Sequence, residues 1–161
     1  MPMSRCLLAL IAPVLCLVAV PTFAQEAKVM SGVSSEKLEA LLKTLKIDFK
    51  KSPHEKIKDS FRYDYERDET KVRLINFKGE DLWIESIFND KLELAEVNAW
   101  NVKAKFTRCV LIPGDKDKKA VASISLEAQL DCSGGATEGM VRQFITRFDG
   151  ELKEFAKFIS K

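Results

Sequence analysis

Residues 98–137 read NAWNVKAKFTRCVLIPGDKDKKAVASISLEAQLDCSGGAT, and they hold the most ordered pattern in the chain. NAWN ends an amphipathic stretch, and the apolar run from Phe106 to Ile112 leads into a charged turn. From Ala120 to Leu130 apolar and polar residues alternate, which is the period of a strand with one buried face. Gly134-Gly135 ends the alternation, and Thr137 can cap a helix. The stretch therefore predicts a helix end, a two-stranded hairpin, a glycine turn and a helix start.

After this turn, apolar residues recur every three or four positions to the end of the chain, which predicts one long amphipathic helix. Its core-facing residues are Val141, Ile145, Phe148, Leu152, Phe155 and Ile159. On the preceding strand, the predicted inward face consists of Ala122, Ile124, Leu126, Ala128, Leu130 and Cys132.

Before residue 98 the pattern predicts two helices and four strands. The first helix begins near Ser34 or Ser35, and the second covers 91–101 with an N-cap at Asn89 or Asp90. The second helix is expected to bury Leu94, Val97 and Trp100. The predicted strands are 47–50, 61–66, 71–77 and 82–88, with a polar loop, SPHEKIKDS, at residues 52–60.

The element order is therefore α-β-β-β-β-α-β-β-α. Short connections between successive strands favour antiparallel hairpins, and strands do not alternate singly with helices. This indicates the α+β class, with an antiparallel sheet of about six strands covered by three helices. The length of 161 residues fits one such domain, expected over residues 34–161.

The first 24 residues have the pattern of an export signal. Arg5 supplies a positive start, residues 7–20 an apolar segment, and Thr22-Phe23-Ala24 a cleavage site before Gln25. The apolar segment is short for a membrane span, so stable membrane insertion is not expected after cleavage. Lipidation at Cys16 is the alternative, but the bulky Leu15 before it argues against this. We expect an exported, periplasmic protein whose residues 25–33 form a loose N-terminal arm.

The charge balance argues against a nucleic-acid partner. The whole chain has a net charge of +2, and removing residues 1–24 takes away Arg5 and no acid. Nucleic-acid binding needs a concentrated basic field that displaces counterions, and a nearly neutral chain lacks one.

Cys109 and Cys132 are the two cysteines that remain after cleavage. An oxidising compartment favours a disulfide between them. The hairpin favours free thiols: with its turn at Asp115–Asp117, Cys109 lies opposite residue 123. Cys132 then lies about 30 Å away, at about 3.3 Å per residue, beyond the reach of a disulfide. Both states remain open.

Several of these residues carry a family resemblance. Asn98-Ala99-Trp100-Asn101, the strand with Phe106, Gly134-Gly135 with Thr137, and the Phe-rich last helix resemble the YbjN-type domain, often labelled a bacterial sensory transduction regulator. The resemblance covers the chain from about Ser34. It implies the fold of type III secretion chaperones, an α+β sandwich that commonly dimerises and binds polypeptide segments, without catalysis. An export signal and the 52–60 loop depart from the family pattern, so the cytoplasmic roles of relatives are not carried over.

No residue constellation predicts catalysis, a metal or a cofactor. His54 is the only histidine and lies in the charged loop, so neither a zinc site nor a nucleophile with a histidine base is expected. The acids Asp64, Glu66, Asp68 and Glu69 are the remaining enzymatic possibility. They define the alternative function, a periplasmic small-ligand binder or hydrolase. The absence of a catalytic pattern favours a non-enzymatic module that binds a protein partner or itself.

Four apolar residues are predicted to lie away from the core-facing pattern: Trp83, Ile87, Phe144 and Phe158. They are candidates for a partner or dimer interface, where aromatic anchors carry much of the binding energy. The alternative is that they are simply core, because six strands and three helices can bury both faces of a sheet. Asn98 and Asn101 are expected to cap the helix end and tie down the next strand rather than to recognise a ligand.

Overall fold

The computed structural model describes residues 28–114 and 123–160. Six antiparallel strands form one sheet in the order β1-β2-β3-β4-β6-β5. The elements are α1 (Ser35–Thr44), β1 (Phe49–Pro53), β2 (Phe61–Arg67), β3 (Thr70–Phe77), β4 (Asp81–Phe88), α2 (Leu94–Lys103), β5 (Arg108–Ile112), β6 (Ser123–Asp131) and α3 (Glu138–Ile159). The α+β class and the element order agree with the sequence-based prediction.

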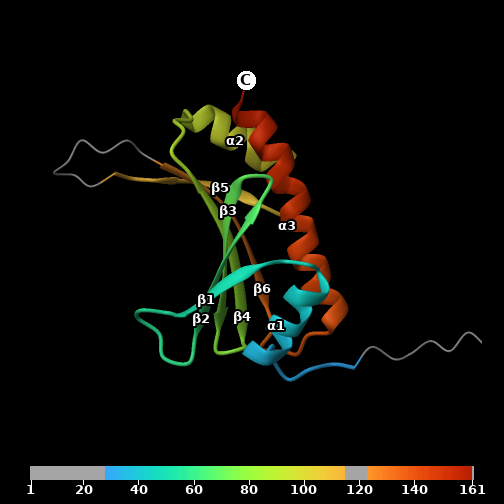
Figure 1. Cartoon of the computed structure of the whole chain (residues 1–161). Helices are drawn as coiled ribbons and strands as arrows, with labels where there is room; N and C mark the ends of the chain where they lie inside the picture. Colours follow the sequence, from blue (N-terminus) through green and yellow to red (C-terminus); the bar gives the residue numbers. More distant parts are fainter. Residues whose placement is uncertain (1–27, 115–122, 161) are drawn as a thin grey trace, which may run out of the picture.

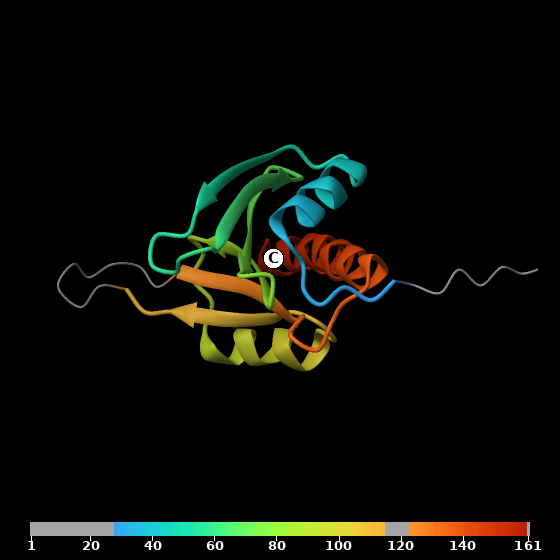
Figure 2. The ribbon, with the colours of Figure 1, turned by 90° about the horizontal axis from the view of Figure 1, so that it is seen from below.

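The helices lie on one side of the sheet and along one edge. Helices α1 and α3 cover one face, and α2 lies beside the edge strand β5 (Figures 1 and 2). The opposite face carries no helix within the described residues. It is called the open face here.

Alternation along the strands separates the two faces, as predicted. The covered face carries Tyr63 and Tyr65 of β2, Leu82 and Ile84 of β4, and Ile124, Leu126 and Ala128 of β6, all buried. They meet Val141, Ile145, Phe148, Leu152 and Phe155 of α3 and the leucines of α1 in one core. Ala122 lies outside the described residues.

The helix starts follow the expected capping chemistry in two of three cases. The Ser34 side chain accepts a hydrogen bond from the Lys37 N–H and starts α1, and Thr137 does the same for α3 with the Met140 N–H. The prediction for α2 is wrong: its N-cap is Glu93, three residues after Asp90, and the Glu96 carboxylate accepts a hydrogen bond from the Glu93 N–H at 2.8 Å. The capping box therefore lies three residues further along the chain, with Glu93 as the N-cap and Glu96 as its partner.

Two further predictions differ from the structure. Strand β1 begins at Phe49 and runs through Ser52 and Pro53, which were assigned to the loop. Proline is tolerated there because β1 is an edge strand with one neighbour. The expected loose arm makes specific contacts over its described part: Met30 and Ala136 exchange two main-chain hydrogen bonds, of 2.8 and 3.0 Å. Val33 is 1% exposed, and its carbonyl accepts from the Asn76 side chain.

Candidate binding surfaces

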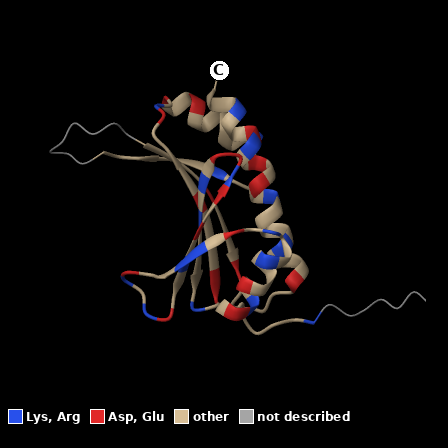
Figure 3. Ribbon diagram, in the orientation of Figure 1, with Lys and Arg blue, Asp and Glu red and all other residues tan. Residues whose placement is uncertain are grey.

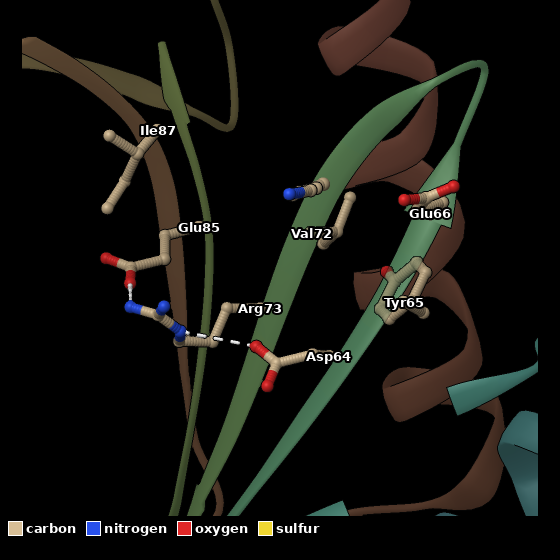
Figure 4. Close-up of a pocket in the computed structure, with 8 residues that line it drawn as sticks. Asp64, Tyr65, Glu66, Val72, Arg73, Glu85 and Ile87 are labelled. Carbon is tan, nitrogen blue, oxygen red and sulfur yellow. Dashed lines mark hydrogen bonds and ion pairs between the residues drawn. The ribbon is translucent and has the colours of Figure 1, made fainter. Parts of the chain in front are cut away.

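A row of charged side chains crosses the open face. Asp64, Arg73, Glu85, Glu127 and Arg108 are successive partners across β2, β3, β4, β6 and β5, and this set is called the charged row. Arg73 contacts Glu85 at 2.9 Å and Asp64 at 3.4 Å (Figure 4). Arg108 contacts Glu127 at 2.7 Å. Figure 3 shows that acidic and basic positions both occur along the strands of the sheet. Every acid of the row is thus paired with an arginine, although Glu85 and Glu127 stand side by side.

The sheet opens between β3 and β4. Their pairing runs from Phe77↔Asp81 only as far as Arg73↔Glu85, although both strands continue for three more residues. A cavity of about 410 Å³ lies at this point, lined by Asp64, Tyr65, Glu66, Lys71, Val72, Arg73, Glu85 and Ile87. Figure 4 shows the two strands diverging beyond Arg73, with Ile87 on one side and Val72 on the other. This place is called the β3–β4 split.

Ile87 and Trp83 point to the open face, as predicted, but they differ in exposure. Ile87 is 45% exposed and lines the split. Trp83 is half-buried: its Nε1–H donates to Glu85 at 3.4 Å, and the Arg108 guanidinium lies 5.5 Å from its ring centroid. Ile87 is therefore available to a partner, whereas neighbouring side chains already cover part of Trp83.

The prediction that Phe144 lies on an accessible surface is wrong. Phe144 is 3% exposed and packs edge-on against Phe106, with ring centroids 5.7 Å apart. Phe158 is half-buried and lies 5.6 Å from the Trp100 ring. The loop before β5 and the C-terminal half of α2 supply these contacts. Phe144 therefore belongs to the core, and Phe158 is largely covered.

Helix α2 presents a side that the sequence analysis missed. Leu94 was assigned to the core but is 63% exposed, and Val102 is 88% exposed. Helical spacing places them on one side with three other exposed residues, Ala95, Asn98 and Ala99. This set, 94, 95, 98, 99 and 102, contains no charge and is called the α2 stripe. A helical projection of residues 94–103 shows the α2 stripe as an uncharged side. The opposite side is also apolar, so the projection does not tell which of the two sides is buried.

The NAWN residues have different roles. Trp100 is 2% exposed and packs against Phe155, at 4.8 Å between ring centroids. Asn101 ties down β5: its Nδ2–H donates to the Cys109 carbonyl at 3.0 Å, and its Oδ1 accepts from the Cys109 N–H at 2.7 Å. The amide side chain thus takes the place of a neighbouring strand. The Asn98 side chain is exposed and makes no hydrogen bond to any described residue, so the expected tie applies to Asn101 alone. The predicted capping by these asparagines is wrong, because α2 continues to Lys103 and its C-cap is Ala104, whose N–H donates to the Trp100 carbonyl.

Of the two adjacent glycines, Gly135 is the one that the turn requires. Its φ is +100°, and a Cβ there would lie 2.8 Å from Val29 Cγ1 and 3.2 Å from the Met30 carbonyl oxygen. A Cβ on Gly134 would meet nothing within 4 Å. Gly135 thus lets the turn approach the N-terminal segment closely.

Cys109 and Cys132 are both buried and free. Cys109 pairs with Leu126 rather than with residue 123, so the predicted register was wrong. Cys132 still lies six positions beyond Leu126, about 20 Å at about 3.3 Å per residue, which exceeds disulfide reach. Burial raises the pKa of each thiol to about 11. Both are therefore poor nucleophiles.

The acids of the alternative hypothesis do not stay together. Asp64 and Glu66 line the split, whereas Asp68 and Glu69 form the β2–β3 turn, both with positive φ. His54 is half-buried and organises its own loop, since Nδ1 accepts from the Lys56 and Ile57 N–H groups at 3.2 Å each. Residues 28–114 and 123–160 contain no group of three or more His, Cys, Asp or Glu side chains placed to hold a metal ion, and none of their helices is both long and apolar enough to cross a membrane.

A polar group formed by Asp149, Arg67 and Tyr65 joins α3 to β2. The Asp149 carboxylate accepts from Arg67 Nε at 2.8 Å and from the Tyr65 hydroxyl at 3.3 Å. Burial raises the pKa of Asp149 above its ordinary value, against the opposing effect of Arg67. The folded state therefore holds this proton more tightly than the unfolded chain.

We expect this proton to make stability depend on pH. Because the folded pKa is raised, the contribution of Asp149 is greatest below its unfolded pKa of about 3.9 and falls as the pH rises through the folded value. Urea unfolding between pH 3.5 and 7 should show the wild type losing stability with rising pH relative to Asp149→Asn. If the stability of the wild type minus that of Asp149→Asn stays constant or increases with rising pH, this account is contradicted.

Comparisons with known proteins identify the fold. No family model matches the chain, and no curated protein matches its sequence. Among solved structures, the crystal structure of YbjN from E. coli, a proposed transcription regulator, aligns with a TM-score of 0.56 and 10% sequence identity. The alignment covers 78% of this chain and 89% of that one. The chain therefore has a YbjN-like fold, as its sequence suggested.

Proposed function

We propose that the chain is an exported, non-enzymatic protein-binding module that self-associates through α2. The observation that carries the proposal is the α2 stripe, an exposed side of the helix that contains no charged residue. Leu94 and Val102 lie at its two ends and are 63% and 88% exposed. Soluble proteins seldom leave contiguous apolar surface uncovered, and such patches commonly mark contact sites. The YbjN-like fold agrees with a binding role, since one solved structure with this fold is described as a proposed regulator.

The stripe is complementary to itself about a two-fold axis. Leu94 and Val102 each lie four residues from Asn98, so an antiparallel copy centred there sets Leu94 against Val102 at both ends. Ala95 and Ala99 allow the helices to approach closely. The Asn98 amide carries both a donor and an acceptor, so two such amides can bond reciprocally.

The open face is less suited to self-association. The inner part of the charged row reads Arg73, Glu85, Glu127, Arg108, which has the same signs in either direction. A two-fold contact centred on it sets arginine over arginine and glutamate over glutamate, whether the axis lies along the row or along the strands. Like charges in contact disfavour an interface.

Substitution of Leu94 by Glu tests the proposed dimer. A ten-residue helix is about 15 Å long, so the buried area is small and the dimer should be weak. Burying a carboxylate at both ends without a partner should weaken it by about 2 kcal/mol, or about 30-fold in the dissociation constant. Sedimentation equilibrium over a wide concentration range measures this constant.

Met140→Glu is the matched control, because Met140 is 43% exposed and lies on α3 rather than α2. This variant should dimerise like the wild type, and so should Trp83→Ala. A wild-type protein that stays monomeric at millimolar concentration, or a Leu94→Glu protein that dimerises normally, would remove the proposed interface.

Export is tested on the same protein. The signal pattern at residues 1–24 lies outside the described residues, so this part of the proposal rests on the sequence. Protein recovered from a periplasmic fraction should begin at Gln25. A cytoplasmic protein that retains residues 1–24 would contradict it.

A further inference from the structure

Another cavity lies at the end of the sheet where the chain enters the fold. There α1, the start of α3 and the N-terminal segment 28–33 lie together (Figures 1 and 2). All three line a cavity of about 600 Å³, larger than the 410 Å³ at the β3–β4 split. Cavities that bind small molecules commonly measure about 300–1,000 Å³. The volume therefore suits a small organic ligand, and this place is called the α1–α3 cavity.

The N-terminal segment forms a fixed wall of the α1–α3 cavity. Met30 exchanges two main-chain hydrogen bonds with Ala136, of 2.8 and 3.0 Å. Three residues later, the Val33 N–H donates to the Gly79 carbonyl at 2.8 Å, and the Val33 carbonyl accepts from the Asn76 side chain at 2.7 Å. Because the segment is tied at two points, the cavity is already formed in the free protein, which lowers the cost of binding a ligand.

The surface that a ligand can touch in this cavity is largely apolar. Val29 lines the cavity although it is 65% exposed, and the half-buried Met30 lies next to it in the chain. The residues of α1 that line the cavity, 37, 40, 41 and 44, share one side of the helix. The nearly fully buried Leu41 and Val141 close the inner end. An alkyl chain along this side of α1 would remove the exposed apolar surface from water.

The rim of the cavity is positively charged. Lys28 of the N-terminal segment and Lys37 of α1 line it, are exposed, and form no ion pair with any described residue. Glu138 is the one acid among the described lining residues, and it contacts Arg142 at 2.9 Å. The first turn of α3 also lines the cavity, and the positive end of the helix dipole has the same sign as the two lysines. The electrostatic complement of this rim is therefore an anion.

We propose that the α1–α3 cavity binds a medium-chain fatty acid, an amphiphile with one alkyl chain and a carboxylate head. The carboxylate accepts hydrogen bonds from the ammonium groups of Lys28 and Lys37. The chain lies along α1 from Lys37 to Thr44 and covers Val29. These two positions of α1 are seven residues apart, about 10 Å of helix, which suits the length of octanoate. This site goes beyond the proposed function and uses neither the α2 stripe nor the acids near Asp64.

Octanoate tests the class of ligand. It should bind with a dissociation constant below about 1 mM and shift the amide signals of residues 29–33, 37–44 and 137–141 in NMR spectra. Octylammonium has the same chain with the opposite charge and should bind at least tenfold more weakly. Acetate has the charge without the chain and should shift none of these signals. The proposal is overturned if octanoate leaves these signals in place, or if either control compound binds as octanoate does.

Lysine variants test the position of the carboxylate. Lys28→Gln and Lys37→Gln should each weaken octanoate binding about threefold, and the double variant about tenfold. Lys43→Gln is the matched control, because Lys43 is exposed on the same helix but lies outside the lining, and it should bind octanoate like the wild type. All three lysines are exposed, so urea unfolding should show unchanged stability. Equal binding by Lys37→Gln and Lys43→Gln would mean that the carboxylate does not reach this rim, and the proposal would fail.

A second pair of variants tests the position of the alkyl chain. Ala40 is exposed and lines the cavity from the middle of α1, so Ala40→Phe places a ring in the cavity without displacing a buried side chain. This variant should weaken octanoate binding at least fivefold. Lys43→Phe adds the same ring three residues further along, outside the lining, and should not weaken binding beyond the effect of Lys43→Gln. If the two phenylalanine variants bind octanoate equally well, the chain does not occupy the cavity and the proposal is overturned.

Two further measurements separate this site from the proposed dimer and from a membrane surface. Octanoate should bind Leu94→Glu as it binds the wild type, and Lys37→Gln should dimerise normally, so loss of the dimer and loss of the fatty-acid site are separate results. Octanoate binding that disappears in Leu94→Glu would contradict a site between α1 and α3. A protein that sediments with phosphatidylglycerol vesicles but does not bind free octanoate would use its lysines at a lipid surface, which also overturns the proposal.

Discussion

Trp100→Ala should lower the free energy of unfolding by about 3 kcal/mol, the largest single-residue effect that we expect. The indole is 2% exposed and lies between α2 and α3, with ring centroids 4.8 Å from Phe155 and 5.6 Å from Phe158. Removing it leaves a cavity that these rings cannot fill without moving. The loss should fall at the low end for tryptophan, because its Nε1–H has no acceptor among the described residues.

Two further variants separate the causes. Trp100→Phe retains an aromatic ring and removes the unpaired N–H, so it should cost less than about 1.5 kcal/mol. Val102→Ala, at an 88% exposed site on the same helix, should change stability by less than about 0.5 kcal/mol. Urea unfolding of dilute protein gives all three values. Equal losses for Trp100→Ala and Val102→Ala would mean that α2 does not pack as described.

Asn101→Ala is the second large effect, at about 2–3 kcal/mol. The substitution leaves the N–H and C=O of Cys109 without their amide partner, next to a side chain that is 2% exposed. Unpaired, partly buried main-chain groups cost about 1–3 kcal/mol each, and water recovers part of this at an edge strand. Opening this edge should also expose the Cys109 thiol. Its reaction with an aromatic disulfide reagent should therefore become faster.

Asn98→Ala is the matched control, because the two asparagines are three residues apart in the same motif. The Asn98 side chain is exposed and makes no hydrogen bond to any described residue, so its loss should change neither the stability of the monomer nor the thiol reaction. The proposed role of Asn101 would be contradicted if both variants behaved alike. A weaker dimer in Asn98→Ala would agree with its place at the centre of the α2 stripe.

The two asparagines also show how much of the candidate sites could be predicted from the sequence. The place of Asn101 at the predicted helix end suggested a tie to the next strand, and its amide makes two hydrogen bonds there. The pattern could not separate Asn98 from it, because both are polar residues at the end of one helix. Nor could it place Leu94, since a helix at a sheet edge carries apolar residues on both sides. The β3–β4 split could not be predicted, because both segments have strand-forming residues over their whole length.

The class of fold, the order of its elements and the side of each strand that is buried can all be predicted from local sequence patterns. These follow from local periodicity and from turn and cap residues, which act within a few positions of one another. Four other features depend on the packing of the whole chain: where β3 and β4 part, which residue pairs with Cys109, the contact between Phe106 and Phe144, and which side of α2 is left uncovered. Each of these depends on how distant segments meet, and a periodic pattern records only that a residue is buried, not what covers it.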